Sequence, residues 1–275
     1  MAQPYHPIGV FDSGYGGLTI LEKIRQRLPE YDYLYLGDNA RAPYGTRSFD
    51  LIYRFTLQAV KHLFEQGCPL VILGCNTASA KALRTIQQRD LPDIDPARRV
   101  LGVIRPTAEA VTRISRNGHV GVLGTPGTIQ SGSYNIEIAK QREDFVTTGH
   151  GCPMWVPLIE NNEADKPGAD YFVKQEIDAL LSEDASIDSV ILACTHYPLL
   201  LPKIRKYLPK NVEVICQGDI VAESLADYLQ RHPEMETRLS KGGKTAFETT
   251  ENARKFSSMA ATFLREPVEA VTVTL

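Results

Sequence analysis

Two cysteines stand in nearly the same phrase at two places in the sequence. VILGCNTASA at 71–80 contains Cys75, and VILACTHYPL at 190–199 contains Cys194. In both copies an apolar run of strand character ends at the cysteine, and small or hydroxylated residues follow where a helix could begin. The two thiols would then occupy equivalent places in two related halves. The alternative is that this motif is only a sequence pattern common to buried strands.

Paired thiols suit the inversion of a carbon centre by two acid–base groups on opposite faces. One cysteine, as thiolate, removes the proton from the α-carbon, and the other, as thiol, delivers a proton to the opposite face. Free cysteine has a pKa of about 8.5, and a helix N-terminus lowers it, so a turn from strand to helix suits a thiolate base. A hydrolase with a single nucleophile, Cys194 beside His196, stays an alternative and predicts that only Cys194 matters.

Polar residues near the two cysteines are candidates for supporting roles. Asp12 in FDSG could orient or assist Cys75, and His196 in CTH could do the same for Cys194. Each has a structural alternative, as a helix-capping aspartate or a hydrogen-bonded core histidine. Hydrogen bonds to a substrate carboxylate could come from backbone N–H groups and from four side chains that could equally cap helices, those of Ser13, Asn76, Thr77 and Thr195.

A further candidate segment, GDNARAPYG at 37–45, contains a Pro-Tyr-Gly turn and an arginine. Tyr44 and Gly45 are candidates for the substrate site. The spacing of Arg41 does not by itself indicate anion binding, because an arginine in a surface turn would give the same pattern.

The elements that must position these residues are short apolar strands alternating with helices. Helical spacing of apolar residues is clear at 17–28 and 49–64. Runs such as LVIL and VILA are hydrophobic throughout, which is typical of parallel strands covered by helices on both faces. In such α/β sheets ligands bind at the carboxyl ends of strands, where the strand order reverses. The strand-like runs are PIGVFD, DYLYLG, PLVILGC, RVLGVI, HVGVLGT, SVILAC, VEVIC and AVTVTL.

A second repeat supports the division into halves. IGVFDSG at 8–14 resembles VGVLGTP at 120–126, an offset of 112, and Cys75 and Cys194 are 119 residues apart. The sequence therefore predicts two similar parallel-sheet α/β domains related by pseudo-symmetry, with the active site in the cleft between them.

The composition narrows the class of protein. The chain has 275 residues and a formal charge of -3, and its basic residues are scattered, so a small-molecule ligand is a better expectation than nucleic acid. No apolar run approaches the roughly 18 residues of a membrane span, and no export signal begins the sequence, so we expect no membrane segment and a cytoplasmic location. An odd number of cysteines without a CxxC pair argues against a disulfide framework or a zinc site.

Six motifs carry a resemblance to a known family: GVFDSGYGGLTIL, GDNARAPYG, CNTASA, GTPGTIQSGSY, CPMWVPLIE and CTHYPLL, in family order. With them the chain resembles, nearly end to end, the glutamate racemases of the aspartate/glutamate racemase superfamily, cofactor-independent enzymes that supply D-glutamate for peptidoglycan. The resemblance implies that Cys75 serves the D-isomer and Cys194 the L-isomer. It also implies that Glu160 lies near Cys194 and His196.

The resemblance extends to the substrate and the assembly. It implies L- and D-glutamate as substrates, a homodimer, and no pyridoxal phosphate or other cofactor. It implies one domain formed by 1–99 plus 212–275 and a second formed by 100–211. The residues that it places around the substrate are Asp12, Ser13, Tyr44, Gly45, Asn76, Thr77, Thr195 and His196.

The sequence departs from the family wording at two places. Ala193 stands where family members often have glycine, and VICQGDIVAESL at 214–225 diverges from the aspartate-and-serine pattern that is common in this part of the family. Besides the single-cysteine hydrolase, two alternatives stay open. The first is a racemase of the same superfamily that acts on aspartate or a hydantoin, and the second is a non-catalytic protein that binds amino acids or regulates other proteins.

Overall fold

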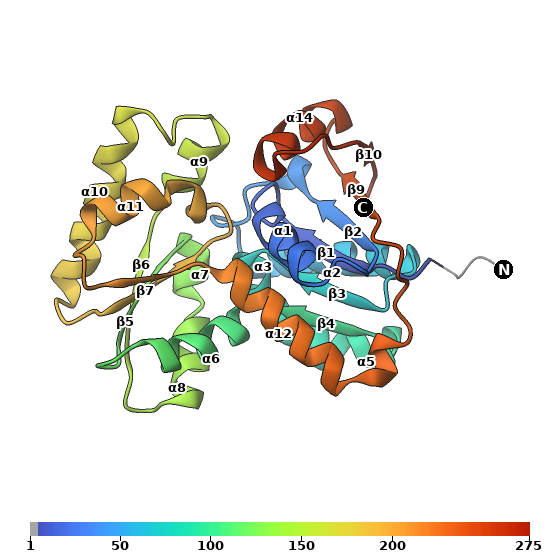
Figure 1. Cartoon of the computed structure of the whole chain (residues 1–275), viewed down its shortest axis with the longest axis horizontal. Helices are drawn as coiled ribbons and strands as arrows, with labels where there is room; N and C mark the ends of the chain where they lie inside the picture. Colours follow the sequence, from blue (N-terminus) through green and yellow to red (C-terminus); the bar gives the residue numbers. More distant parts are fainter. Residues whose placement is uncertain (1–4) are drawn as a thin grey trace.

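The computed structural model describes residues 5–275, which form two lobes, each built around one parallel sheet (Figure 1). The larger sheet has the order β10-β9-β2-β1-β3-β4, and the smaller has the order β6-β5-β7-β8. The strands of the larger sheet are β1 (Ile8–Asp12), β2 (Tyr33–Gly37), β3 (Leu70–Leu73), β4 (Arg99–Gly102), β9 (Thr245–Thr249) and β10 (Ala270–Thr272). Those of the smaller are β5 (His119–Gly124), β6 (Val146–Gly151), β7 (Ser189–Ala193) and β8 (Glu213–Ile215).

Helices cover both sheets. Those of the larger lobe are α1 (Leu18–Arg27), η1 (Asn39–Arg41), α2 (Phe49–Glu65), α3 (Asn76–Lys81), α4 (Leu83–Thr85), η2 (Ile86–Asp90), α5 (Leu91–Ile94), α12 (Gln217–Arg231), α13 (Pro233–Glu236) and α14 (Ala253–Leu264). Those of the smaller lobe are α6 (Ile104–Ile114), α7 (Pro126–Gln130), α8 (Ser133–Gln141), α9 (Trp155–Glu160), α10 (Pro167–Glu183), η3 (Tyr197–Leu200) and α11 (Leu201–Tyr207). The helices predicted at 17–28 and 49–64 are confirmed as α1 and α2.

The central strands are apolar because both of their faces are buried. In β1, Ile8 and Val10 belong to a core shared with α1, α12 and α14, whereas Phe11 belongs to a second core with α2 and α3. Side chains alternate across a strand, so a strand between two helical layers must be hydrophobic at every position. The predicted α/β class is therefore confirmed.

The two lobes share one strand order. Read by position along the chain, β2-β1-β3-β4 in the larger sheet corresponds to β6-β5-β7-β8 in the smaller. In both sheets the order reverses between the first and third strands of the set, which are β1 and β3, or β5 and β7. Loops after such strands diverge, and ligands bind there in α/β proteins. The predicted pseudo-symmetry has this structural basis.

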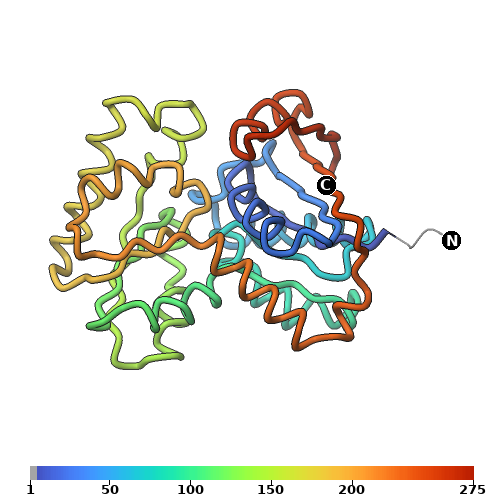
Figure 2. The backbone as a smooth tube through the Cα atoms, viewed as in Figure 1, coloured from blue at the N-terminus to red at the C-terminus, as the bar shows by residue number. Residues whose placement is uncertain are grey.

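The chain passes between the lobes twice, after β4 and after β8 (Figure 2). β4 pairs with β3 in the larger sheet, and β8 pairs with β7 in the smaller. The division proposed at 99 and 211 stays a prediction. Two strands, β6 and β9, do not correspond to any strand-like run that the sequence predicts.

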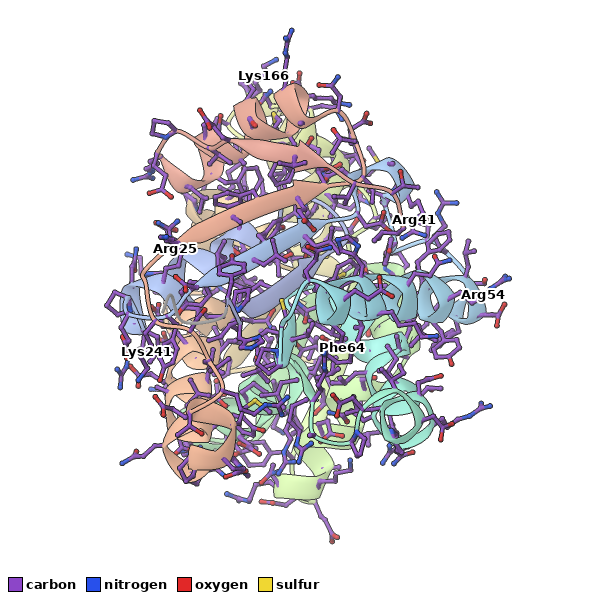
Figure 3. All side chains as sticks on the ribbon, turned by 90° about the vertical axis from the view of Figure 1, so that its right-hand side faces the viewer. Arg25, Arg41, Arg54, Phe64, Lys166 and Lys241 are labelled. Atoms are coloured by element: carbon purple, nitrogen blue, oxygen red, sulfur yellow. The ribbon has the colours of Figure 1, made fainter. Side chains whose placement is uncertain are left out.

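Charged side chains are spread over the surface (Figure 3). Arg54, Lys166 and Lys241 point outward from different parts of the chain, and each forms an ion pair with a nearby carboxylate. Within residues 5–275, no helix is both long and apolar enough to cross a membrane, and no three or more His, Cys, Asp or Glu side chains gather as they would around a metal ion.

Candidate active site

Cys75 lies at the junction between β3 and α3. Its Sγ accepts a hydrogen bond from the backbone N–H of Ala78 at 3.5 Å, which makes Cys75 the N-cap of α3. Ser13 follows β1, the strand that pairs with β3, and its Oγ lies 3.4 Å from the same sulfur. The adjacent ends of two parallel strands thus bring Ser13 to Cys75.

Cys75 is buried and holds its proton at neutral pH. Only 5% of the residue is exposed, and burial, with the charge of Asp12 and to a lesser extent that of Cys194, raises the pKa of Cys75 to about 12. The hydroxyl of Ser13 and the N–H of Ala78 act in the opposite direction. The helix N-terminus thus lowers the pKa of Cys75 as expected, but desolvation is the larger effect, and the pKa is raised overall.

Cys194 has a different polar partner. Its Sγ lies 3.9 Å from Nδ1 of His196, and Nε2 of His196 lies 3.0 Å from Oε1 of Glu160. Burial favours the neutral imidazole, but the hydrogen bonds to Cys194 and Glu160 outweigh burial and raise the pKa of His196 to about 10. His196 therefore carries a positive charge beside the sulfur of Cys194.

Asp12 joins the two halves of this site. It is buried at the end of β1, where its Oδ1 accepts from the N–H of Gly14 at 2.8 Å and its Oδ2 accepts from the hydroxyl of Thr195 at 3.4 Å. Burial raises the pKa of Asp12, and the positive charge of His196 opposes that rise. The sequence assigned Asp12 to Cys75 alone, whereas the structure also brings it to the loop that carries Cys194.

Glycines in DSGYGG allow the two strand-end loops to touch. A Cβ on Gly16 would lie 2.2 Å from Oγ1 of Thr195 and 2.4 Å from Nδ1 of His196. A Cβ on Gly17 would lie 2.5 Å from the Cβ of Asp12. Gly16 therefore serves the close packing of one lobe against the other, and Gly17 serves the close approach of its own loop to Asp12.

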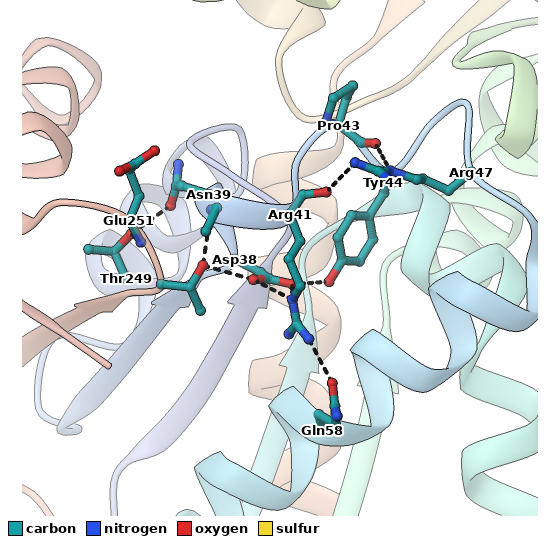
Figure 4. A network of polar contacts seen from close by, with 11 residues as sticks. Asp38, Asn39, Arg41, Pro43, Tyr44, Arg47, Gln58, Thr249 and Glu251 are labelled. Atoms are coloured by element: carbon teal, nitrogen blue, oxygen red, sulfur yellow. Dashed lines mark hydrogen bonds and ion pairs between the residues drawn. The ribbon is translucent and has the colours of Figure 1, made fainter. Parts of the chain in front are cut away.

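The loop with Tyr44 is held by a network around Asp38 (Figure 4). The buried Asp38 carboxylate accepts from the Tyr44 hydroxyl, from Nε of Arg41 at 2.9 and 2.7 Å, and from the Thr250 hydroxyl at 2.8 Å. Arg41 also donates to Gln58 at 2.6 Å. Arg41 therefore neutralises a buried carboxylate, and the Tyr44 hydroxyl points to Asp38.

Gly45 and Thr77 lie against the second lobe. The carbonyl of Gly45 accepts from the N–H of Gly127 at 2.9 Å. A Cβ on Gly45 would lie 2.8 Å from the Cβ of Thr125. The hydroxyl of Thr77 lies 3.0 Å from that of Thr125 and 3.3 Å from that of Thr128. The start of α3 and the Tyr44 loop thus contact the N-terminus of α7.

Known proteins match this arrangement over nearly the whole chain. A family model described as Asp/Glu/Hydantoin racemase matches residues 8–225. The chain belongs to this racemase family. The glutamate racemase of Ruegeria sp. (strain TM1040) is 42% identical over 271 residues, which cover 95% of this chain and 97% of that protein.

Solved structures of racemases agree with the sequence match. A glutamate racemase isoform from Bacillus anthracis superposes with a TM-score of 0.89 at 34% identity, covering 98% of both chains. A glutamate racemase from Francisella tularensis in complex with D-glutamate has a TM-score of 0.86 at 32% identity, covering 98% of this chain and 97% of that one. The protein is therefore an amino-acid racemase, an isomerase with the two-domain fold of its relatives.

In this racemase the side chain of Asn76 is occupied by protein partners at both ends. Its Nδ2 donates to Gln217 at 2.6 Å, and its Oδ1 accepts from the Tyr134 hydroxyl at 2.7 Å. Sequence reasoning missed Gln217, Tyr134 and Asp38. Each lies in a segment that the sequence had singled out: Gln217 in VICQGDIVAESL, Tyr134 in GTPGTIQSGSY and Asp38 in GDNARAPYG.

Proposed function

We propose that the chain is a glutamate racemase that interconverts L- and D-glutamate by a two-base mechanism, with Cys75 and Cys194 as the acid–base residues and no cofactor. One observation carries this proposal. Two buried cysteines end equivalent strands, β3 and β7, of two sheets with the same strand order, and each has its own polar neighbours. A nucleophilic mechanism would use only one of these thiols.

In the L-to-D direction Cys194 is the base. Its thiolate, supported by the charge of His196, takes the proton of the α-carbon, and the C–H electron pair stays on that carbon. The thiol of Cys75 then gives its proton to the opposite face, which leaves Cys75 as thiolate and Cys194 as thiol. The reverse reaction exchanges these roles. The raised pKa values of Cys75 and His196 support a resting enzyme that is ready for the L-isomer.

Other polar groups of the site have proposed supporting roles. Asp12 and Glu160 adjust the protonation of His196 and of the two thiols through their negative charges. Hydroxyls and backbone N–H groups of Ser13, Tyr44, Gly45, Asn76, Thr77 and Thr195 donate to the substrate carboxylates, and hydroxyl oxygens accept from the substrate ammonium. For Tyr44 the backbone N–H is the available group, because its hydroxyl donates to Asp38. For Asn76 the backbone N–H is the available group, because its side-chain amide is held by Gln217 and Tyr134.

Glutamate is proposed as the substrate because similar chains have that activity. The relative from Ruegeria is named glutamate racemase, and the Francisella tularensis structure contains D-glutamate. A role in supplying D-glutamate for peptidoglycan follows from this substrate. A homodimer and a cytoplasmic location stay predictions.

The test is exchange and inversion of L- and D-glutamate in deuterated water, followed by NMR and circular dichroism. Wild type should invert both isomers and exchange the α-proton, and inversion should fall by about 10³-fold or more in both Cys75→Ser and Cys194→Ser. Absence of inversion by wild type would refute glutamate as the substrate, with aspartate as the next to try. Loss of activity in only one variant would refute the two-base mechanism.

A further inference from the structure

Three buried side chains close a ring of hydrogen bonds behind Cys75. Asn76 donates through Nδ2 to Oε1 of Gln217 at 2.6 Å, Gln217 donates through Nε2 to the Tyr134 hydroxyl at 2.8 Å, and Tyr134 donates to Oδ1 of Asn76 at 2.7 Å. Nε2 of Gln217 also donates to the Thr107 hydroxyl at 3.0 Å, which donates to the carbonyl of Val103 at 2.7 Å. The hydroxyls of Tyr134 and Thr107 thus each accept from Gln217 and donate to a further oxygen, that of Asn76 and that of Val103.

The ring lies where the chain passes between the lobes. Gln217 is the first residue of α12, directly after the second crossing, and Thr107 lies in the first turn of α6, directly after the first crossing (Figure 2). Tyr134 comes from α8 of the smaller lobe, and Asn76 is the first residue of α3 in the larger lobe. The ring therefore ties both crossings to the helix that begins at Cys75.

These side chains are removed from solvent. Asn76, Gln217 and Tyr134 are each 2% exposed, and Thr107 is fully buried. A buried donor or acceptor that loses its partner is left without water to replace it, so opening the ring at any point affects every member. The closed ring consequently favours a single orientation of the first turn of α3.

The orientation of that turn matters to Cys75. The sulfur of Cys75 accepts from the N–H of Ala78, which lies in the same first turn of α3 as Asn76. A tilt of the turn would lengthen this 3.5 Å contact and change the position of the sulfur relative to the α-carbon of a substrate. Among residues 5–275, no corresponding ring of hydrogen bonds involves Cys194, whose sulfur is 3.9 Å from Nδ1 of His196.

We propose that Gln217 is a positioning residue for Cys75, acting through Asn76 across the junction between the lobes. The inference rests on the proposed two-cysteine function. The proposal assigns a role to VICQGDIVAESL, the segment in which this sequence departs from the pattern common in its family. It also predicts that Gln217 affects proton transfer at one thiol and not at the other.

The experiment compares Gln217→Met, which keeps the shape of the side chain but not its hydrogen bonds, with wild type. Because the two enantiomers have equal free energy, kcat/KM must fall equally in both directions, by about ten- to a hundredfold. The informative readout is the primary deuterium isotope effect on kcat/KM with α-deuterated D- and L-glutamate. Slower transfer at Cys75 should raise the effect for the D-isomer and lower it for the L-isomer.

Matched variants keep the test interpretable. Gln87→Met removes a hydrogen bond from Gln87 to the carbonyl of Val100, outside the ring, and should leave both isotope effects unchanged. Tyr134→Phe opens the same ring, so the double variant with Gln217→Met should lose about as much kcat/KM as one single variant. If Gln217→Met does not fold, Gln217→Glu retains the acceptor for Asn76 while losing both donated bonds, and should shift the isotope effects in the same directions.

Two results would overturn the proposal. The first is a fall in kcat/KM with both isotope effects moving together, which is the behaviour of a general loss of structure. The second is no difference between the Gln217→Met and Gln87→Met variants. Neither is confused with failure of the proposed function, because wild type is measured first and an enzyme that does not invert glutamate gives no isotope effect at all.

Discussion

The two halves of the site share a frame but differ in their chemistry. In both, a cysteine follows a buried parallel strand beside the strand at which the order reverses. Cys75 caps a helix and faces the hydroxyl of Ser13, whereas Cys194 precedes the short η3 helix and faces the His196–Glu160 pair. The strand order sets where each sulfur lies, and local partners set how easily each gains or loses a proton.

This difference makes the halves unequal at rest. Burial keeps Cys75 protonated, since its pKa is raised to about 12, while His196 with a pKa of about 10 places a positive charge beside Cys194. A racemase must treat two mirror-image substrates equally in kcat/KM, but the two proton transfers need not share the barrier equally. Variants on each side should therefore produce opposite isotope effects.

The largest expected effect comes from the acid–base partners of the two thiols. His196→Gln should lower kcat/KM by about 10²- to 10⁴-fold and raise the α-deuterium isotope effect for L-glutamate, because transfer at Cys194 becomes slower. Asp12→Asn should lower kcat/KM too but raise the effect for D-glutamate, because the proposed partner of Asp12 is Cys75. Steady-state rates with labelled substrates measure both.

The bond between Thr195 and Asp12 allows a different result. If Asp12→Asn shifts the isotope effects in the same direction as His196→Gln, Asp12 acts chiefly on the Cys194 half. The proposed pairing of Asp12 with Cys75 would then be wrong, although the two-base mechanism would remain.

A smaller effect is expected from the contact between the lobes at Gly16. In Gly16→Ala the new methyl would lie 2.2 Å from Thr195 and 2.4 Å from His196, so these side chains must move. A displacement of about 1 Å at a catalytic group can lower the rate by about a hundredfold. The isotope effect should rise for L-glutamate, as in His196→Gln.

Gly14→Ala is the matched control in the same loop. Its methyl would lie 3.5 Å from Glu160 and 3.7 Å from Asn39, which is ordinary contact, so activity should stay within a fewfold of wild type. Equal losses in the two variants would mean that the loop needs glycine for its backbone and not for its approach to His196.

How far the sequence predicts the fold depends on burial. Strands such as β3 and β7 are recognisable because they are covered on both faces and hydrophobic at every position. The sequence VTTGHG of β6 is not, because β6 is an edge strand that the sheet leaves half-exposed. β9, with the sequence TAFET, buries only Phe247 and Thr249 and owes its place to pairing with β2 and β10.

The same limit applies to the candidate site. The rule for strand ends places candidate site residues such as Ser13 and Cys75 after strands, but which of these strands are neighbours comes only from the structure. The rule does not show that the Tyr44 hydroxyl turns to Asp38, or that Asn76 bonds to Gln217 from 141 residues away. Such contacts depend on how the two lobes and the C-terminal segment pack together. Local sequence patterns do not predict this packing.

The smallest expected effect concerns the pair that distinguishes the Cys194 half, His196 and Glu160. The pKa of His196 is about 10 in the folded protein and 6.5 in an exposed imidazole, so folding favours the protonated form. The resulting stability is fully present below pH 6.5 and is lost as the pH rises through about 10. Glu160→Gln removes one of the two groups that raise this pKa.

The free energy of unfolding in urea should therefore fall in Glu160→Gln by about 1 kcal/mol near pH 6. The effect is modest because 28% of the Glu160 side chain is exposed. The difference from wild type should shrink between pH 6.5 and about 10, the interval over which folded His196 loses its proton. Glu163→Gln, which removes the exposed ion pair with Lys166, should show no such trend over this interval. A difference at Glu160 that is constant with pH would mean that Glu160 does not support the charge of His196, and the contrast between the two halves would then rest on the thiols alone.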